Sequence, residues 1–459
     1  MFQALRPTLA PPPNKDDDAR DSGLGLSLPF ESLRHLRLGR NTCPFAAIFH
    51  RKYLWISHIF LYFSIANASV ILLGIEHSTA HPTRGFTMTQ LAPNRYDVVG
   101  SFLRPERLKE ARAQHAAGAI DDAALTAIEN ECITELIERE KAAGLRFITD
   151  GEFRRGYWHL DFMWGFGGID HVELERGYQF VGEETTKGSA ILTGKITGSG
   201  HPFIEHFKFV QQFEDENHTA KQTVPAPAQL LLELYRNEAA IERVHAIYPD
   251  EEELFADIAA AYRTFIEEIY EAGCRNLQFD DCTWGILVDD RYWKDRRGDD
   301  FSEITEAEKY LRLNNLVLEG KPEGMVINTH VCRGNYHSTY ASSGPYDAIA
   351  PFLFSREHTD AFYLEFDDER SGSFEPLKYV PESKKVVLGL ITTKRPELED
   401  RDAVIARIHE AAQIVPLENL CLSPQCGFAS CEIGNKLTED EQWAKVALVK
   451  SIAEEVWGC

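Results

Sequence analysis

From Arg95 onward, short apolar runs rich in β-branched and aromatic residues alternate with longer stretches in which apolar residues recur at helical spacing. The β-type runs number eight: YDVVGS (96–101), RFITDGE (146–152), KQTVPAP (221–227), NLQFDD (276–281), GMVINTHVC (324–332), AFYLEFD (361–367), KVVLGLIT (385–392) and LCLSPQC (420–426). Such alternation is typical of parallel βα units. The pattern therefore predicts an α/β fold, specifically a TIM (β/α)8 barrel over residues 91–459.

The clearest of the intervening helical stretches is 251–272. Its apolar residues form one stripe and Gly273 follows as a C-terminal cap; the stripe consists of Leu254, Ile258, Ala261, Tyr262, Phe265 and Ile269. Further helices are predicted at 121–143, 302–319, 399–414 and 438–457. Residues 153–215 are too long and too β-rich for a simple crossover, so they predict an inserted hairpin or small subdomain between strands two and three.

The first 90 residues differ from the rest and predict an extension outside the barrel. Residues 1–26 are rich in Pro, Asp and Gly and are expected to be disordered. Residues 53–75 carry no Asp, Glu, Lys or Arg, and about 20 apolar residues suffice to span a bilayer. Two interpretations stay open: a genuine membrane anchor, or a non-native extension ahead of a translation start at Met88.

Composition narrows the possible partners. A formal charge of −24 argues against a nucleic-acid partner, because binding to a phosphate backbone requires a basic face. Nine irregularly scattered cysteines do not indicate a disulfide framework and fit a reducing compartment. We therefore expect a cytoplasmic protein, or a membrane-anchored one if residues 53–75 span a bilayer.

Four potential metal ligands stand at the ends of predicted strands. They are His330 and Cys332 in INTHVC, Glu365 in AFYLEF and Cys426 in LCLSPQC. Zinc accepts this mixture of imidazole, thiolate and carboxylate, and the carboxyl ends of barrel strands converge on one mouth. The alternative is that both cysteines are small buried apolar residues and that the glutamate caps a loop.

Three further strand ends carry polar groups, in Val99-Gly100-Ser101, Asp150-Gly151-Glu152 and Asp280-Asp281. A glycine before a hydroxyl lets the backbone approach a ligand closely. Acidic groups from separate strands could hold a substrate ammonium through charge-assisted hydrogen bonds. The alternative for each acid taken alone is capping of the helix that follows the strand.

Several of these motifs resemble one known family. DVVGSFLRPERL, FITDGEFRRG, LQFDD, INTHVC, FYLEFDD and LSPQCGF, in this order over residues 94–457, are similar to the catalytic barrel of cobalamin-independent methionine synthases, and above all to their short single-barrel relatives. The resemblance implies methionine biosynthesis by a homocysteine S-methyltransferase with a zinc ion that activates the thiol. It also implies roles for individual residues: zinc ligands His330, Cys332, Glu365 and Cys426; Ser101 on the substrate carboxylate; Glu152, Asp280 and the Val99 carbonyl on its ammonium.

This sequence also departs from the family pattern. Full-length synthases have a second, N-terminal barrel, for which this chain has no room. Their seventh strand ends in a histidine that acts as general acid towards methyltetrahydrofolate, whereas GLITTKRPELE offers Ile391, Thr392 and Thr393. VPAPAQLLLELY after strand three also lacks their folate-contacting tryptophan. His159 or His337 is a possible proton donor, although an exposed loop histidine is the favoured interpretation of each.

We therefore predict a zinc-dependent methyltransferase whose small-molecule substrates are homocysteine or a related thiol and a methyl donor that the sequence leaves open. One alternative is a zinc hydrolase on the same barrel, with water in the fourth position of the metal. Another is a non-catalytic zinc-binding relative that kept the fold after losing folate chemistry.

Overall fold

The structure is a computed structural model that describes residues 92–289 and 302–458. The chain divides into two units, Met1–Gly85 and Phe86–Cys459, and every described residue belongs to the second. The uncharged segment 53–75 lies outside the described residues, so both interpretations of it stay predictions. None of the helices in the described ranges is long and apolar enough to cross a membrane.

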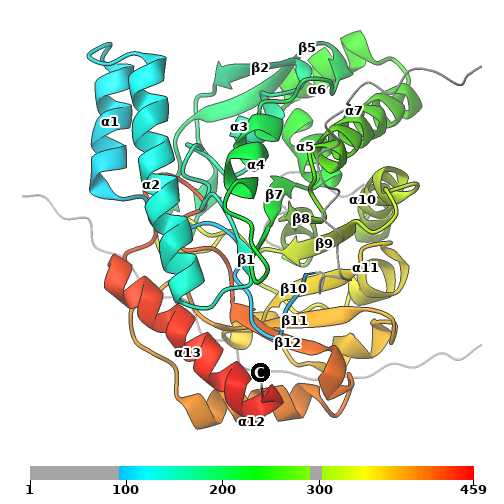
Figure 1. The fold of residues 1–459 in the computed structure, drawn as a ribbon. Coiled ribbons are helices and arrows are strands. Elements are labelled where there is room, and N and C mark those ends of the chain that lie inside the picture. The colour runs from blue at the N-terminus through cyan, green and yellow to red at the C-terminus, as the bar shows by residue number, and fades with distance from the viewer. Residues whose placement is uncertain (1–91, 290–301, 459) are drawn as a thin grey trace, which may run out of the picture. The chain divides into compact units, whose positions relative to one another are not determined.

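A parallel sheet of six strands lies at the centre of the described unit (Figure 1). The strands pair in the order β12-β11-β10-β9-β8-β7, so strands that are adjacent in the sheet are also consecutive in sequence. They are β7 (Gln222–Pro225), β8 (Asn276–Asp281), β9 (Val326–Val331), β10 (Ala361–Glu365), β11 (Lys385–Ile391) and β12 (Leu420–Pro424). The α/β class and the last six predicted strands are thereby confirmed.

The second predicted strand is shorter than the run 146–152 indicates. Only β1 (Phe147–Ile148) remains of it, and β1 pairs in parallel with β6 (Thr219–Ala220). Only Lys221 separates β6 from β7, so β1 lies next to β7 in the order of strands. The ladder stops after β1 because the amide of Thr149 donates to the buried side chain of Glu140, at 3.0 Å, instead of to a neighbouring strand.

The first predicted strand, 96–101, is reduced to a single parallel bridge between Tyr96 and Leu422 of β12. A buried ion pair holds the rest of the segment in place of a ladder. The ammonium group of Lys221 donates to the Asp97 side chain at 3.2 Å and to the next carbonyl along the chain at 2.5 Å. The segment that carries the first group of predicted site residues is therefore fixed by side chains.

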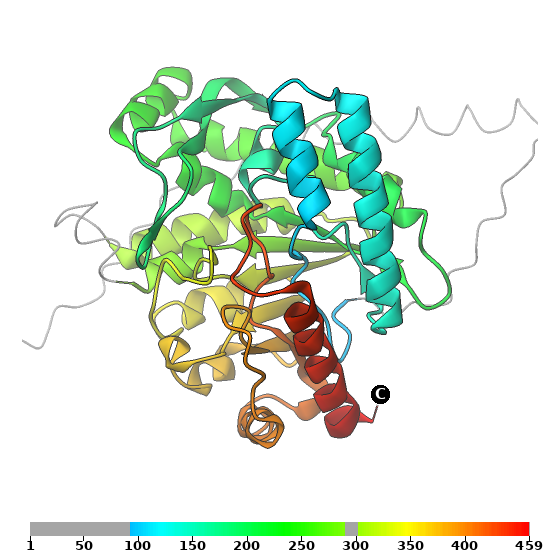
Figure 2. The same ribbon diagram turned by 90° about the vertical axis from the view of Figure 1, so that its left-hand side faces the viewer.

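Helices separate most of the strands along the chain and lie outside the sheet in both views (Figures 1 and 2). They are α1 (Glu106–Ala116), α2 (Asp122–Ala142), α4 (Phe203–Gln211), α5 (Pro227–Leu234), α6 (Glu238–Ile247), α7 (Glu251–Glu271), α8 (Thr283–Leu287), α10 (Glu303–Leu318), α11 (Ala350–Arg356), α12 (Arg401–Ala411) and α13 (Glu439–Trp457). The five helical stretches predicted from apolar spacing correspond to α2, α7, α10, α12 and α13, and are confirmed.

α7 shows how the sequence sets both helix ends. The Asp250 side chain accepts a hydrogen bond from the first turn, and every residue of the predicted stripe is buried. At the other end Gly273 has a φ of +109°, and its amide donates to the Tyr270 carbonyl at 2.9 Å. The amide of Cys274 donates to the Ile269 carbonyl at 3.0 Å, which completes a Schellman cap. The predicted glycine cap is therefore confirmed.

Besides α4, the chain between β1 and β6 forms a short helix and two antiparallel pairs. They are α3 (Leu160–Met163), the pair β2 (Gly167–Glu173) with β5 (Gly188–Thr197), and the hairpin β3 (Gln179–Phe180) with β4 (Glu183–Glu184). The β-rich insertion expected after strand two is thus present.

The β3–β4 hairpin is tied to the loop that follows β9. The amide of Val181, at the tip of the hairpin, donates to the Tyr340 carbonyl at 3.0 Å, and the Thr339 hydroxyl donates to the Val181 carbonyl at 2.8 Å. These bonds place side chains of the insertion beside the loop that continues from the predicted metal ligands His330 and Cys332.

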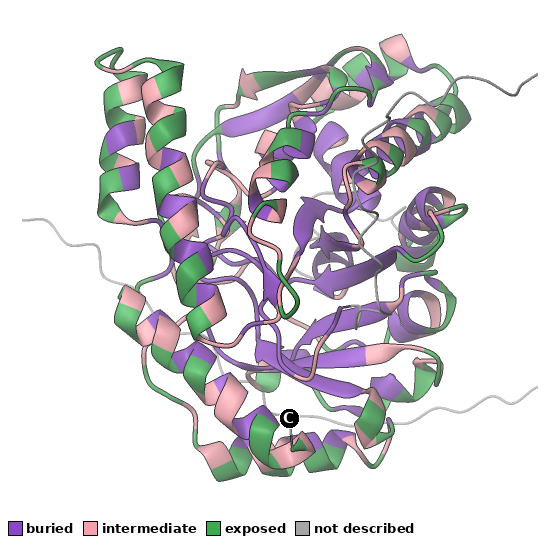
Figure 3. Cartoon of the chain, in the orientation of Figure 1, coloured by how far each residue is buried: buried purple, intermediate pink, exposed green. Residues whose placement is uncertain are grey.

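The sheet is buried on both faces (Figure 3). Every residue of β8, β9 and β12 is buried, which is typical of parallel strands covered by helices. Helices such as α1 and α12 alternate buried inner positions with exposed outer ones. Polar side chains at the strand ends are therefore the ones placed to face a ligand.

Candidate functional site

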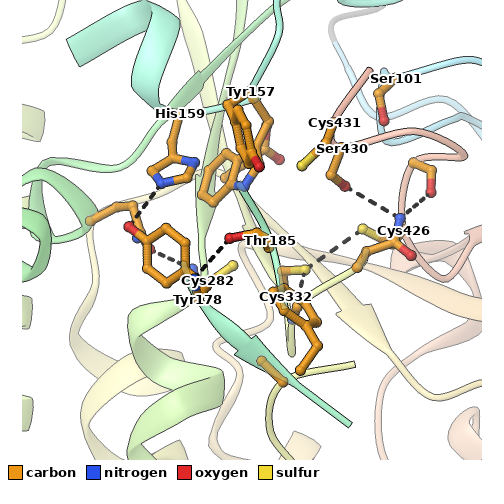
Figure 4. Close-up of a pocket in the computed structure, with 18 of the residues that line it drawn as sticks. Ser101, Tyr157, His159, Tyr178, Thr185, Cys282, Cys332, Cys426, Ser430 and Cys431 are labelled. Atoms are coloured by element: carbon orange, nitrogen blue, oxygen red, sulfur yellow. Dashed lines mark hydrogen bonds between the residues drawn. The ribbon is translucent and has the colours of Figure 1, made fainter. Parts of the chain in front are cut away.

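A pocket opens where the carboxyl ends of β8, β9 and β12 meet (Figure 4). Parallel strands end at a common edge, and this brings together residues that are far apart in the sequence. Every predicted site residue except Glu365 lines this pocket: Val99, Ser101, Glu152, Asp280, His330, Cys332 and Cys426.

The four predicted metal ligands lie together. In the part of the chain that the structure describes, one ligand atom from each of His330, Cys332, Glu365 and Cys426 lies within 4.8 Å of the others, and all four residues are buried. The two sulfur atoms are 3.6 Å apart. Two thiolates at about 2.3 Å from a tetrahedral ion lie about 3.8 Å apart, so this pair is spaced as ligands of one ion.

Several polar atoms of this group lack hydrogen-bond partners. Both ring nitrogens of His330 and Oε2 of Glu365 are buried and unpaired. A buried polar group left without a partner costs about 1–3 kcal/mol, so three such atoms beside two thiols indicate a missing partner. A cation would satisfy Oε2 of Glu365 and one of the two ring nitrogens of His330. The donor set of imidazole, thiolates and carboxylate is one that zinc accepts, and the residues present fit that ion.

Glu365 is held from one side by a neighbour that the sequence analysis missed. The amide of Gln425 donates to Glu365 Oε1 at 3.1 Å, and its own oxygen accepts from the amide and hydroxyl of Thr393 at 3.2 and 3.0 Å. The orientation of the Gln425 amide is therefore set, and Oε2 of Glu365 is left for a metal ion. Gln425 is a positioning residue, and its place beside Cys426 in SPQC is the only signal for it in the sequence.

The surroundings of the four predicted metal ligands favour an ionised Glu365 carboxylate and a neutral Cys426 thiol. Burial alone would raise the pKa of Glu365, but nearby cations, of which Lys394 contributes most, outweigh burial and lower it. The hydrogen bond to Cys332 and burial together raise the pKa of Cys426 well above the ordinary range of a thiol. A bound metal would reverse this, because a coordinating ion deprotonates a thiol outright.

A third thiol stands beside the group. Cys282 follows β8 directly, is buried, lines the pocket and makes a hydrogen bond with Cys332. It is outside the set of four mutually close ligand atoms. One cysteine after an acidic pair carries no ligand spacing, so nothing in the sequence marks Cys282 as a site residue.

The side-chain amide of Gln278 makes hydrogen bonds to two of the groups that we expect to bind a substrate ammonium. Nε2 of Gln278 donates to the Val99 carbonyl and to Asp280 Oδ1, each at 2.8 Å. Asp281 turns away from the pocket, since its Oδ1 accepts from the Thr283 amide at 2.8 Å. The acidic pair therefore divides: Asp280 faces the pocket, and Asp281 caps the start of α8.

Glu152, the other acid of the expected ammonium site, has strained backbone geometry. Its φ is +61°, a left-handed conformation that costs a non-glycine residue about 1–3 kcal/mol and occurs mainly at functional sites. Oε1 accepts from the Thr223 hydroxyl at 3.0 Å and from Arg155 at 3.1 Å, while Oε2 is buried without a partner. Burial raises the pKa values of Glu152 and Asp280 to about 7.

The predicted carboxylate contact, Ser101, lies against the chain after β12. A Cβ atom on Gly427 would lie 1.8 Å from Ser101 Oγ, so only glycine permits this approach. The glycine that precedes Ser101 has a different reason: a Cβ on Gly100 would lie 2.7 Å from the Thr223 side chain. Gly100 therefore makes room for a neighbouring strand, and its close approach to a ligand stays a prediction.

One wall of the pocket is aromatic, which the sequence analysis did not predict. It consists of Tyr157, Trp158, His159, Tyr178 and Phe180, from the segment after β1 and from the β3–β4 hairpin. In Figure 4 the rings of Tyr157, His159 and Tyr178 gather on one side and Cys426 lies on the other. The run Tyr-Trp-His and the i, i+2 spacing of Tyr178 and Phe180 are the signals that could have found it.

The two candidate histidines have different environments. His159 lines the pocket and is only 3% exposed, so the interpretation of it as an exposed loop residue is wrong. Its Nε2 lies 3.1 Å from the Tyr178 hydroxyl, which donates to Glu233, and burial lowers the pKa of His159 to about 3. His337 is half-buried, contacts Glu183 at 3.0 Å and is not among the residues that line the pocket.

Residues 96–454 match the family described as cobalamin-independent synthase, catalytic domain. The chain belongs to the cobalamin-independent methionine synthase family. The resemblance stated from the sequence motifs over residues 94–457 is thereby confirmed, and the match spans the described sheet from Tyr96 to β12 and into α13.

Individual relatives support the same assignment. The Bacillus subtilis protein YxjH, itself uncharacterised, is 42% identical over 367 residues, which cover 80% of this chain and 95% of the relative. A crystal structure from Listeria monocytogenes, described as a proposed vitamin-B12-independent methionine synthase, has a TM-score of 0.64 at 40% identity and covers 81% of this chain and all of its own. A B12-independent methionine synthase from Shewanella, in complex with selenomethionine, has a TM-score of 0.58 at 17% identity, covers 79% and 97% of the two chains, and supports the fold alone.

Proposed function

We propose that this protein is a zinc-dependent methyltransferase that transfers a methyl group to the thiol of homocysteine or a related thiol. One observation carries the proposal: three of the four potential zinc ligands, His330, Cys332 and Cys426, line the same pocket as the acids expected on a substrate ammonium. Family membership supports it, since relatives named methionine synthase include one from Saccharolobus islandicus that is 24% identical over 364 residues.

We infer that the strands close into the TIM barrel expected from the sequence. The segment 96–102 supports closure because it contacts both sides of the gap between β12 and β1: Tyr96 bridges to Leu422, and the Phe102 amide donates to the Gly151 carbonyl at 3.1 Å. β1 in turn pairs with β6, the strand that precedes β7. A barrel accounts for the convergence of all the site residues on one mouth.

The metal centre would consist of His330, Cys332, Glu365 and Cys426. Bound there, zinc would lower the pKa of the substrate thiol below its usual value of about 8.5 and keep its sulfur nucleophilic. Two thiolates and a carboxylate bring more negative charge than a divalent ion neutralises, and this excess favours an electron-rich substrate sulfur. Glu365 is the ligand that we expect to yield to the substrate, because its oxygen is the hardest donor and Gln425 already holds the carboxylate.

The amino-acid end of homocysteine would lie between the other strand ends. Glu152 and Asp280 would pair with the ammonium, with the Val99 carbonyl as a third acceptor, and Ser101 would donate to the carboxylate. Support comes from the unpaired Oε2 of Glu152 and from Gln278, which binds the Val99 and Asp280 oxygens and so keeps them together. Such pairing would place the substrate thiol towards the metal ligands and away from the mouth.

The experiment that tests the function is methyl transfer by the zinc-loaded protein. Homocysteine and a panel of labelled methyl donors (methyltetrahydrofolate, methylcobalamin and a methylsulfonium) would be supplied separately, and labelled methionine measured by mass spectrometry. We expect labelled methionine with at least one donor. Zinc-loaded protein that binds homocysteine and yet forms no methionine with any of them would contradict the proposal.

Replacing Asp280 with asparagine should weaken homocysteine binding and leave the metal in place. A buried ammonium that loses one charged partner costs on the order of 2–5 kcal/mol, which is about thirty-fold or more in affinity. Calorimetry would measure the affinity and elemental analysis the zinc. The same change at Asp347, which is exposed and outside the pocket, is the matched control and should alter neither. Unchanged affinity for homocysteine in Asp280→Asn would rule out that Asp280 pairs with the ammonium.

Binding of the amino acid should release protons near neutral pH. Burial raises the pKa of Glu152 to about 7; Arg155 and Arg104 oppose this, and Asp280 and Asp150 add to it. An ammonium beside Glu152 favours its carboxylate, so binding expels the proton that the free protein holds. Affinity should therefore be at its full value above about pH 7 and fall as the pH drops through this value.

Methionine is the best ligand for this measurement, because it has no thiol proton to lose. Calorimetry in buffers of different ionisation enthalpy should show release of roughly half a proton at pH 7 from Glu152, and Glu152→Gln should abolish that part. Affinity that stays constant, or that rises towards acid pH, would contradict the prediction.

A further inference from the structure

Three rings of the aromatic wall make no cation–π contact within the described residues: Phe180 and the adjacent pair Tyr157 and Trp158. The ring of Tyr178 is already covered by Arg236, whose guanidinium carbon lies 3.6 Å from the ring centroid. Tyr157 and Trp158 line the pocket as well, and neither takes part in any cation–π contact within the described residues. The hydroxyl of Tyr157 is bound by the Thr186 amide at 2.8 Å, which fixes its ring. A pocket wall of this kind presents electron-rich faces.

Acids line the pocket, and the cations nearest to them lie behind its lining: Arg155 on Glu152 and Arg236 on the Tyr178 ring. Glu152 and Asp280 line the pocket, together with the thiols of Cys332 and Cys426. Among the described residues that line it, none is a lysine or an arginine. Homocysteine would pair with both acids, so the attraction that remains for a second, cationic ligand comes from the faces of Tyr157 and Trp158.

His159 adds no positive charge to this wall. Its Nε2 lies 3.1 Å from the Tyr178 hydroxyl, and that hydroxyl donates to Glu233. With the Tyr178 proton directed to Glu233, the histidine must donate through Nε2, which leaves Nδ1 as a neutral acceptor, buried and without a partner. The ring is therefore placed as a neutral neighbour of Trp158, at 4.6 Å between centroids.

We propose that the methyl donor is a compact methylsulfonium whose charged sulfur lies against the rings of Tyr157 and Trp158. This deepens the proposed function and rests on it. The charge of a sulfonium sits on the sulfur that carries the methyl group, so the same contact that binds the donor also places that group within the pocket. Aromatic faces and negative charge recognise such an onium group in the way that aromatic cages recognise quaternary ammonium.

The reaction balances without a general acid. The homocysteine thiol gives up its proton to solvent, and the thiolate sulfur attacks the methyl carbon. The bond between the methyl carbon and the sulfonium sulfur breaks, and its electron pair goes to that sulfur. The products are methionine and a neutral dialkyl sulfide. Since the leaving group departs as a neutral molecule, a pocket whose free histidine is held neutral is sufficient for the transfer.

The first arm of the test compares a charged ligand with an uncharged one of the same shape. A dimethylsulfonium group and an isopropyl group, each on the same neutral amide tail, differ only in the sulfur cation. Calorimetry on the zinc-loaded full chain should show the sulfonium binding at least about tenfold more tightly. Equal affinity for the two ligands would overturn the proposal, whether or not the protein transfers methyl groups.

The second arm uses ring variants. Tyr157→Leu and Trp158→Leu should remove most of that preference, whereas Tyr157→Phe and Trp158→Phe, which keep a ring, should retain a large part of it. Tyr379→Leu, at an exposed position outside the pocket, is the control and should leave the preference unchanged. If both leucine variants still bind the sulfonium more tightly than the isopropyl ligand, the preference comes from the carboxylates alone. That result would overturn the role of the rings.

The third arm measures transfer of a labelled methyl group from the sulfonium amide to homocysteine. We expect labelled methionine at a rate at least about tenfold above that with methylcobalamin and at least about a hundredfold above that with methyltetrahydrofolate. Faster transfer from methylcobalamin would overturn the sulfonium assignment and leave the proposed function intact. Absence of transfer from every donor would contradict the proposed function itself, and the two ligands of the first arm would still decide whether the wall binds sulfonium.

Discussion

Replacing both Cys332 and Cys426 with serine is expected to reduce bound zinc from about one ion per chain to almost none. Their sulfur atoms are 3.6 Å apart and lie in the group whose ligand atoms are within 4.8 Å of one another. Thiolates contribute much of the binding of a borderline-soft ion, and a serine hydroxyl does not ionise to replace them. Elemental analysis of the purified protein would measure the ion, and each single change should already remove most of it.

Two other cysteines serve as controls for this measurement. Cys132 is on α2, away from the pocket, and Cys132→Ser should leave the zinc content unchanged. Cys282 is the stricter comparison, because it is buried beside Cys332 but outside the set of four close ligand atoms. Cys282→Ser should keep the zinc, and retention of zinc in the double Cys332, Cys426 variant would remove these residues from the site.

The sheet was predictable wherever strands bury both faces. The run at 385–392 is apolar from Val386 to Ile391, and it forms β11, in which only Lys385 is outside the buried class. Apolar runs of this kind are distinctive because a strand covered on both sides needs no alternating polar residues. The helices were equally predictable, because an amphipathic stripe and its caps are local features of the sequence.

Strand lengths at the start of the chain were less predictable. The run 96–101 looks like a strand, yet only Tyr96 bridges to β12, and a buried ion pair between Lys221 and Asp97 secures the segment. The contact partners are 124 positions apart. The local sequence does not show that such distant residues will form an ion pair. It therefore predicts only that residues 96–101 are extended.

Some site residues were predictable from the sequence and others were not. His330, Cys332, Glu365 and Cys426 could be selected because each is a chemically distinctive residue at the end of a predicted strand, and strand ends converge. Gln425 could not, because glutamine is common and its partners Glu365 and Thr393 are distant in sequence. The aromatic residues could be noticed in the sequence but not placed at the pocket, because their position depends on how the insertion packs. His159 was misjudged for that reason: the β3–β4 hairpin, which supplies Tyr178 beside it, buries it.

Methyltetrahydrofolate is expected to be a poor methyl donor for this protein, at least about a hundredfold slower than its best donor. Transfer from the folate nitrogen requires that nitrogen to be protonated, and a general acid for such a step supplies about 10²–10⁴-fold. Of the two histidines among the described residues that line the pocket, His330 belongs to the metal group, and burial lowers the pKa of His159 to about 3. His159 is therefore neutral at pH 7 and holds no proton on the nitrogen that it leaves free.

Glu152 and Asp280 are the remaining candidate acids, because burial raises their pKa values to about 7. Homocysteine would remove them from this role, since its ammonium stabilises both as carboxylates before the donor reacts. Single-turnover formation of methionine from labelled methyltetrahydrofolate, followed in the wild-type protein and in Glu152→Gln, would separate the possibilities. A wild-type rate within about tenfold of the best donor would contradict the prediction; loss of that rate in Glu152→Gln, with homocysteine still bound, would identify Glu152 as the source of the proton.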